Sequence, residues 1–323
     1  MVKAAILGAA GQIGSPLSLL LKSSDLLTEL SLYDVVHAPG IATDLNHIDT
    51  PAKVSGFLPA EDGLKQALTG ADIVVIPAGI ARKPGMTRDD LFKTNAGVIR
   101  DLVTGVATVC PKAFVLIITN PVNSTLPIAV EVLKKHNVFD AKKVFGVTTL
   151  DVVRASTFLA HVLKDSDPKK YKIPVVGGHS GSTILPLYSQ CKPSVELNKE
   201  QLDALTYRVQ FGGDEIVQAK AGAGSATTCM AYAAFRFVSA ILKADAGASG
   251  IREEAYVYLP GVPGGQEIAK KLGSDYFGVP LDFGKGGAQK AYDIGSLSDY
   301  EQGLVDTALD QLAKDVKKGL DFS

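Results

Sequence analysis

The chain has 323 residues, of which 46% are hydrophobic and 21% charged, and its formal net charge is −1. This length suffices for two domains with a large core, and the small charge excludes a general electrostatic attraction to nucleic acid or to an anionic membrane. No hydrophobic run approaches the roughly 18 residues of a membrane span, since Ala113–Ile118 is typical of the longest runs.

Short hydrophobic runs alternate with helical segments in about the first 150 residues. Such runs are typical of parallel strands that are covered on both faces, and we expect crossover helices over Ile13–Lys22 and Asn95–Val109. The expected strands are Ala4–Leu7, Leu30–Tyr33, Ile73–Ile76, Val115–Ile118 and Val144–Val147. This alternation predicts an α/β fold of the Rossmann type, with a doubly wound parallel sheet.

The pattern changes in the second half, which predicts a mixed α+β domain. A short strand is expected to end within Pro174–His179, and Ala255–Leu259 and Gly278–Phe283 are typical of antiparallel strands. The expected helices are Asp151–Lys164, Gln201–Ala219, Ala226–Leu242 and Ser298–Lys318. We therefore predict a dinucleotide-binding domain over residues 1–148 and a substrate-binding, catalytic domain over residues 149–323.

A glycine-rich turn, Gly8-Ala9-Ala10-Gly11-Gln12-Ile13-Gly14, lies between the first expected strand and helix. Glycines allow the backbone to approach a pyrophosphate, which the N-terminus of the following helix attracts. The motif departs from the usual G-x-G-x-x-G because Ala9 stands at the first glycine. We interpret this segment as part of the fold and not as a signal peptide, because its hydrophobic run is interrupted by glycines.

Asp34 strengthens the prediction of a dinucleotide site. It lies twenty residues beyond Gly14, at the end of the second expected strand. A carboxylate at this place accepts hydrogen bonds from the adenosine ribose and repels a 2′-phosphate, which favours NAD over NADP. The alternative is that Asp34 is a turn or helix-capping residue.

Ligands of doubly wound sheets bind beyond the carboxyl ends of the strands. Four residues follow such ends and should line one crevice: Gly8, Asp34, Gly79 and Asn120. The amide of Asn120 can donate to a substrate oxygen or help to seat the nicotinamide ribose. The alternative is a simple turn, which Asn-Pro commonly marks.

His179 is the best candidate for a general base, because its flanking glycines leave the imidazole accessible at a strand end. Asp151 lies 28 residues upstream, and a buried carboxylate there would fix the tautomer of the imidazole and stabilise its charged form. Arg154 follows Asp151 by three residues and shares its face of a helix. The alternative is an ion pair between Asp151 and Arg154 on the helix surface.

The segment Ile80–Arg88 places two arginines, Arg82 and Arg88, around Pro84-Gly85. Each guanidinium can pair with a carboxylate through two hydrogen bonds, so the segment suggests a lid over a small dianion. A solvated basic loop is the alternative.

Other classes of site find little support. The three cysteines (Cys110, Cys191 and Cys229) are widely spaced, which favours buried thiols in a reducing compartment. No two histidines or cysteines have the spacing of metal ligands, and no basic stripe points to nucleic acid, so we expect neither partner.

Together these segments resemble the NAD-dependent malate dehydrogenases of the lactate/malate dehydrogenase superfamily, over essentially the whole chain. The resemblance is carried by Ile80–Leu91, Thr119–Asn123, Leu150–Arg154 and Gly177–Gly181, which occur in the family's order. The glycine-rich loop with Ala9 in place of the first glycine also resembles that of the mitochondrial-type and bacterial branch of the family. The resemblance implies reversible, NAD-dependent oxidation of (S)-malate to oxaloacetate.

The resemblance also implies a role for each polar residue. His179 is expected to accept the proton, with Asp151 as its orienting partner. The substrate-binding residues are expected to be Arg154 at the carboxylate beside the reacting carbon, Arg82 at the distal carboxylate, Arg88 at the carbonyl and Asn120 at both substrate and cofactor. NAD is expected to contact the loop Gly8–Gly14, Asp34, Asn95, Ile118, Thr119, Asn120 and Met230. A Met in a hydrophobic helix is nevertheless usually a core residue.

Lactate dehydrogenases resemble the chain but carry a glutamine where Arg82 stands. Burying an unpaired Arg82 against the methyl group of lactate would cost on the order of several kcal/mol. Arg82 thus argues against the alternative of a dehydrogenase for lactate or another 2-hydroxy acid. The intact His–Asp pair argues against a silent dinucleotide-binding protein.

The resemblance further implies a homodimer or homotetramer, for which Gly14–Leu21 and Ala155–Leu163 are candidate interface segments. The chain begins almost at its first strand, which fits either a cytosolic protein or a processed mitochondrial one. We expect a cytoplasmic protein. The alternative is the mitochondrial matrix after removal of a transit peptide.

Overall fold

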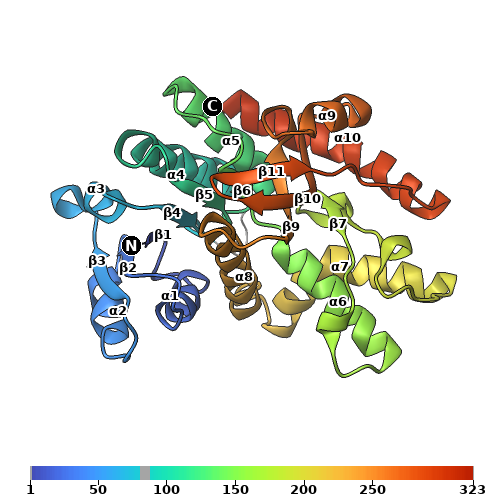
Figure 1. Ribbon diagram of the computed structural model, residues 1–323, viewed down its shortest axis with the longest axis horizontal. Helices are drawn as coiled ribbons and strands as arrows, with labels where there is room; N and C mark the ends of the chain where they lie inside the picture. Colours follow the sequence, from blue (N-terminus) through green and yellow to red (C-terminus); the bar gives the residue numbers. More distant parts are fainter. Residues whose placement is uncertain (1, 81–87, 323) are drawn as a thin grey trace.

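The structure is a computed structural model that describes residues 2–80 and 88–322, with only the backbone for residues 88–91. Within these residues eleven strands form one sheet, in the order β3-β2-β1-β4-β5-β6-β9-β10-β7-β8, with β11 beside β10. The sheet runs through the middle of the molecule, and helices lie above and below it in Figure 1.

The first six strands form the parallel, doubly wound part of the sheet. Their spatial order, 3-2-1-4-5-6, and their parallel pairings confirm the predicted fold class. Their bounds are β1 (Lys3–Leu7), β2 (Glu29–Tyr33), β3 (Lys53–Phe57), β4 (Ile73–Ile76), β5 (Phe114–Ile117) and β6 (Val144–Gly146). All four residues of β4 and of β5 are buried, as expected for strands covered on both faces.

Helices α1 to α5 connect these strands. They are α1 (Gly14–Lys22), α2 (Ala38–Leu45), α3 (Gly63–Leu68), α4 (Arg88–Val109) and α5 (Val122–Lys135). Helix α4 begins seven residues before the predicted Asn95. The sequence pattern did not predict β3 or α5. The strand β3 lies at the edge of the sheet with a single fully buried residue, and α5 contains Pro127, so both carry weak signals.

The second half is mixed, as predicted. Its helices are α6 (Thr149–Leu163), α7 (Lys199–Ala219), α8 (Thr228–Asp245), α9 (Gly265–Leu272) and α10 (Asp299–Phe322). Its strands are β7 (Val175–Gly177), β8 (Ile184–Pro186), β9 (Ile251–Tyr258), β10 (Tyr276–Gly284) and β11 (Gly287–Ala291). The strands β9 and β10 pair in antiparallel fashion, which confirms that prediction.

The two halves share one hydrophobic core. A single antiparallel pairing, Gly146 with Tyr256, joins the parallel strands to the second half, and buried side chains of both halves form one cluster. A smaller cluster lies mainly between α6, α7 and β7. This continuous packing fixes the groups of the second half against the carboxyl ends of the parallel strands.

The cysteines are free, but not all are buried. Cys110 and Cys191 are buried as predicted, and burial raises the pKa of the Cys110 thiol to about 12. Cys229 is only partly buried, so the prediction was wrong for this residue, which sits in the first turn of α8. Among the described residues no helix is long and hydrophobic enough to cross a membrane.

Candidate active site

The glycine-rich turn forms a cradle at the N-terminus of α1. A Cβ atom at Gly14 would lie 2.0 Å from the carbonyl oxygen of Gly8, and a Cβ atom at Gly8 would lie 2.6 Å from the backbone of Ala78. Ala9 is fully buried and donates its N–H to the carbonyl of Tyr33. Its φ angle is not positive, so the backbone here does not require a glycine. No side chain caps the N-terminus of α1, so its N–H groups suit an incoming anion.

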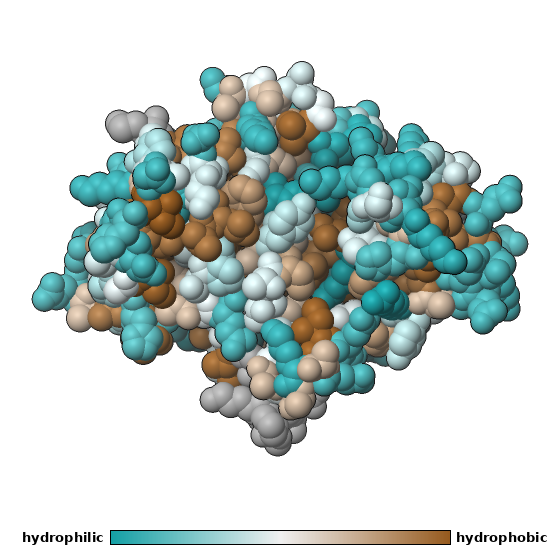
Figure 2. Space-filling view, turned by 90° about the horizontal axis from the view of Figure 1, so that it is seen from below, coloured by the Kyte–Doolittle hydropathy of each residue, from teal (hydrophilic) through white to brown (hydrophobic). Residues whose placement is uncertain are grey.

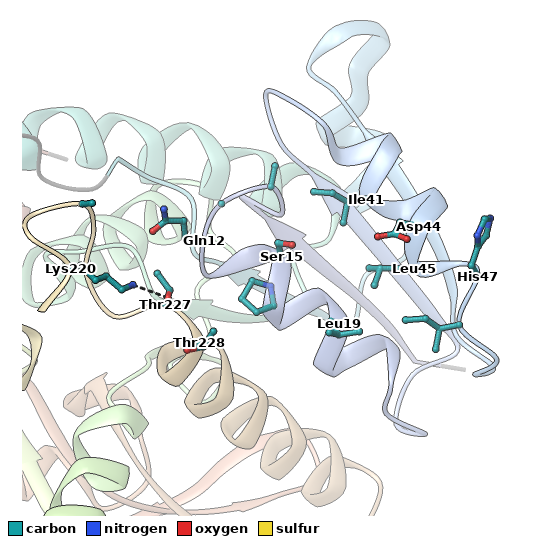
Figure 3. Close-up of a pocket in the computed structure, with 15 residues that line it drawn as sticks. Gln12, Ser15, Leu19, Ile41, Asp44, Leu45, His47, Lys220, Thr227 and Thr228 are labelled. Carbon is teal, nitrogen blue, oxygen red and sulfur yellow. Dashed lines mark hydrogen bonds between the residues drawn. The ribbon is translucent and has the colours of Figure 1, made fainter. Parts of the chain in front are cut away.

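A cavity of about 1040 Å³ adjoins this cradle. Figure 3 shows Gln12 of the glycine-rich turn and Ser15 of α1 in the middle of this cavity. Asp44 of α2 lies on one side of them, and Lys220 and Thr227, from the segment before α8, lie on the other. The cavity shares Ala10, Gly11 and Gln12 with the cradle and does not include His179 among its lining residues. It therefore extends the crevice at the glycine-rich turn and not at His179.

Asp34 lies where the sequence pattern placed it, directly after β2. Its Oδ2 atom accepts from the N–H of Ala10 at 2.8 Å, and its Oδ1 atom accepts from the N–H of Val35 at 2.7 Å. The carboxylate thus ties the glycine-rich turn to the end of β2. Its predicted contact with the ribose stays a prediction.

The predicted crevice residues do come together. A Cβ atom at Gly79 would lie 2.9 Å from Oδ1 of Asn95 and 3.0 Å from Thr119, and Gly8 packs against Ala78. The hydroxyl of Thr119 donates to the carbonyl of Ile76 at 3.0 Å. The ends of β1, β4 and β5 therefore meet at one edge, with the exposed Asn120 beyond them.

Asn95 has a structural role that the sequence did not predict, and Met230 is a core residue, which is the alternative stated for it above. Asn95 is buried: its Oδ1 accepts from the N–H of Ile80 at 2.9 Å and its Nδ2 donates to the carbonyl of Asn120 at 2.8 Å. Asn95 thus holds the backbone of Ile80, where the predicted lid begins, against that of Asn120. Met230 is 4% exposed and packs in the core. Ile118 and Thr119 are also buried. Direct contacts of these residues with NAD stay predictions.

His179 and Asp151 form a buried pair. The Nδ1 atom of His179, just after β7, lies 2.6 Å from Oδ2 of Asp151 in the first turn of α6. Asp151 is fully buried, and the His179 side chain is 10% exposed. Because the carboxylate only accepts, Nδ1 carries the proton and Nε2 is left with a lone pair for a substrate hydroxyl.

Arg154 joins this pair, but the surface ion pair considered above is wrong, because both residues are buried. Nη1 of Arg154 lies 3.6 Å from Oδ1 of Asp151. Nη2 of Arg154 and Oδ1 of Asp151 have no hydrogen-bond partner among the described residues. A buried guanidinium nitrogen without an acceptor is costly unless an anion reaches it, so Arg154 fits a carboxylate-bearing substrate.

The two arginines of the predicted lid have side chains outside the described part of the chain. Arg82 lies outside the described residues, as does the side chain of Arg88, whose backbone begins α4. Their substrate-binding roles therefore stay predictions from the sequence.

Comparisons with known proteins identify the family of the chain. Residues 2–146 match the model of the lactate/malate dehydrogenase NAD-binding domain, and residues 148–323 match that of the lactate/malate dehydrogenase α/β C-terminal domain. The chain is 51% identical over 320 residues to the mitochondrial malate dehydrogenase of Felis catus, an alignment that covers 99% of this chain and 91% of that protein.

Solved structures give the same result. The apo malate dehydrogenase of Picrophilus torridus matches with a TM-score of 0.85 at 26% identity, covering 99% of this chain and 98% of that one. A lactate dehydrogenase of Cryptosporidium parvum, solved with lactic acid and β-nicotinamide adenine dinucleotide, matches with a TM-score of 0.80 at 26% identity, covering 100% and 98%. The prediction of NAD as cofactor is confirmed, and the chain belongs to the lactate/malate dehydrogenase family.

Proposed function

We propose that the protein is a malate dehydrogenase, which reversibly oxidises (S)-malate to oxaloacetate with NAD. The observation that carries the proposal is the buried Arg154 next to the His179–Asp151 pair, because Nη2 of Arg154 has no acceptor among residues 2–80 and 88–322 and can bind a carboxylate. The identity of 51% to a malate dehydrogenase over nearly the whole chain supports it. This activity would give the protein a place in the tricarboxylic acid cycle.

The His–Asp pair carries out the proton transfer. Nε2 of His179 accepts the proton of the malate hydroxyl while the C–H bond at the same carbon breaks. Asp151, 2.6 Å from Nδ1, stabilises the imidazolium that forms. NAD, when bound, accepts the hydride at its nicotinamide C4. In the reverse direction the imidazolium returns the proton to the carbonyl oxygen of oxaloacetate.

The substrate is held by its two carboxylates. Arg154 binds the carboxylate beside the reacting carbon, and Arg82 binds the distal one. Arg88 polarises the carbonyl, and Asn120 donates to the substrate from the end of the crevice. The two domains thus supply different groups. Residues 1–148 supply the turn that binds NAD and the lid, and residues 149–323 supply His179, Asp151 and Arg154.

The protein is further proposed to act as a homodimer through the face formed by α1 and α8. The large hydrophobic side chains of Leu19 in α1 and Tyr232 in α8 are 47% and 43% exposed, so both can pack against a second copy of the chain. Figure 2 views this side of the molecule and shows hydrophobic side chains over α1. Sedimentation equilibrium should give twice the 33.9 kDa of one chain, and Leu19→Asp should lower that mass. A monomer at micromolar concentration contradicts the dimer, and a mass of four chains favours the tetramer.

We propose that the protein is located in the cytoplasm, with the mitochondrial matrix as the alternative. The free cysteines suit either reducing compartment. The mitochondrial name of the relative supports the alternative. Cell fractionation with an antibody distinguishes the two.

The experiment that tests the activity is the formation of NADH, followed at 340 nm, from NAD and (S)-malate. The controls are (S)-lactate with NAD and (S)-malate with NADP. Turnover of (S)-malate with NAD alone supports the proposal. Turnover of lactate favours a dehydrogenase for another 2-hydroxy acid, and the absence of turnover favours a silent dinucleotide-binding protein.

A further inference from the structure

The catalytic histidine lies in a loop that needs an anchor for its backbone. Gly177 and Gly181 have positive φ angles of 96° and 47°, and Gly178 directly precedes His179. Glycines leave the backbone of such a loop free to take many conformations. The contact with Asp151 holds only the imidazole ring, through its Nδ1 atom. Nε2 keeps a defined place only if the backbone of His179 is held as well.

Asn123 of α5 supplies this second anchor. Its Oδ1 accepts from the N–H of His179 at 2.8 Å, and its side chain is fully buried. A Cβ atom at Gly178 would lie only 2.6 Å from this oxygen, so the glycine makes room for the contact. The backbone and the side chain of His179 are thus fixed by two different helices, α5 and α6.

Asp315 of α10 determines the orientation of the Asn123 amide. Nδ2 of Asn123 donates to Oδ2 of Asp315 at 2.9 Å and to the hydroxyl of Ser180, also at 2.9 Å. A carboxylate only accepts and a peptide N–H only donates, so a single orientation of the amide satisfies both neighbours. Asp315 is itself held, because Gln311 donates to its Oδ1 and Ser124 donates to its carbonyl.

We infer that Asn123, oriented by Asp315, is a positioning residue for His179 in the dehydrogenase reaction, an inference that rests on the proposed function. The pattern requires a donor and an acceptor on one side chain, and the amide of Asn123 provides both. An aspartate at position 123 would set two carboxylates against each other. The third anchor of the active site is therefore the C-terminal helix, 192 residues from Asn123.

Exchanging the two side chains tests the inference. In Asn123→Asp the carboxylate at 123 repels Asp315, and we expect kcat for oxaloacetate reduction to fall about 100-fold, with KM changed less than about threefold because no substrate contact is lost. Adding Asp315→Asn restores a donor opposite an acceptor, and kcat should return to within about fivefold of the original. The matched control is Asp310→Asn, the same change at an exposed position of α10, which should leave kcat unchanged.

Hydrogen exchange gives a readout that does not depend on activity. The amide of His179 should exchange faster in Asn123→Asp and slow again in the double variant. If Asn123→Asp does not fold, Asp315→Ala tests the same link, with an expected fall in kcat of about tenfold at constant KM.

A double variant no better than Asn123→Asp in both kcat and exchange overturns the inference, as does an unchanged kcat in Asp315→Ala. If the original protein reduces no 2-oxo acid, the proposed function fails instead. In that case the exchange data still decide whether Asn123 holds the backbone of His179.

Discussion

Nδ1 of His179 lies 2.6 Å from Oδ2 of Asp151, although 28 residues separate the two in the sequence. The same carboxylate faces Arg154 through its other oxygen, at 3.6 Å. Asp151 thus lies between the imidazole of His179, which is proposed to take the proton, and the guanidinium of Arg154, which is proposed to bind the substrate. Its burial makes both interactions strong, because little water screens them.

Replacing Asp151 should therefore abolish most of the activity. In Asp151→Asn the negative charge that stabilises the imidazolium is lost, and kcat should fall about 10³-fold or more. Steady-state NADH oxidation measures this, with circular dichroism as the check of folding. Asp101→Asn, the same change in an exposed ion pair, is the control and should be neutral. A kcat for Asp151→Asn within threefold of the original would sink the assigned role.

Two neighbouring glycines of α7 give a matched pair of variants. A Cβ atom at Gly212 would lie 3.1 Å from Nε of Arg154, whereas a Cβ atom at Gly213 meets nothing within 4 Å. Gly212→Ala should displace the guanidinium and raise KM for oxaloacetate about threefold to tenfold. Gly213→Ala should keep KM and raise the free energy of unfolding by about 0.5–1 kcal/mol through helix propensity. Equal KM values in the two variants would contradict the close packing of the Arg154 guanidinium against Gly212.

Glu254 of β9 makes stability depend on pH. Burial, and then the charge of Glu253, raise its pKa from 4.5 to about 7, and Arg236 and Arg252 only partly offset this. Between these values the unfolded chain has released a proton that the folded chain retains. The free energy of unfolding therefore falls as the pH rises from about 4.5 to about 7. Above pH 7 the carboxyl is ionised in both states, and the free energy of unfolding falls no further for this reason.

The variant Glu254→Gln has no carboxyl at this place and should not lose stability in this way as the pH rises. We expect it to be more stable than the original by about 1–2 kcal/mol at pH 8, and equally stable at pH 4, where the carboxyl is neutral in both states. Urea unfolding followed by circular dichroism suits a chain without tryptophan. Glu196→Gln, at an exposed position, should show no such difference. A gain from Glu254→Gln that is the same at both pH values would contradict the explanation.

The parallel strands and the crevice were predictable because their signals are local. Buried strands such as Ile73–Ile76 are continuous hydrophobic runs, and the residues that follow them must meet at one edge. The His179–Asp151 pair could be proposed because few partners suit an imidazole at a strand end. The burial of Arg154 was not predictable, since the same spacing fits an exposed ion pair.

The bracing contacts had no local signal. Asn123 belongs to a segment that the sequence analysis singled out, yet its link to Asp315 joins residues far apart in the chain. Asn95 was expected near NAD, whereas its amide is engaged by the backbone of Ile80 and Asn120. Such side chains hold together elements that are far apart in the sequence. Their partners depend on how the elements pack, so the local sequence pattern does not predict them.

Arg82 is predicted to set the choice of substrate. Arg82→Gln removes the partner of the distal carboxylate, so kcat/KM for oxaloacetate should fall about 10²-fold or more while activity on pyruvate rises relative to it. Steady-state kinetics with both substrates measure the change. Lys93→Gln, an exposed site in the first part of α4, serves as the charge control. Unchanged turnover of oxaloacetate in Arg82→Gln would exclude the assigned role.

The most direct test of the whole account is the ratio of kcat/KM for oxaloacetate to that for pyruvate, measured by NADH oxidation at 340 nm on the unaltered protein. The account predicts a ratio of about 10³ or more, because each tenfold step needs only about 1.4 kcal/mol and a buried, unpaired arginine costs several times that. A ratio near or below one would contradict it.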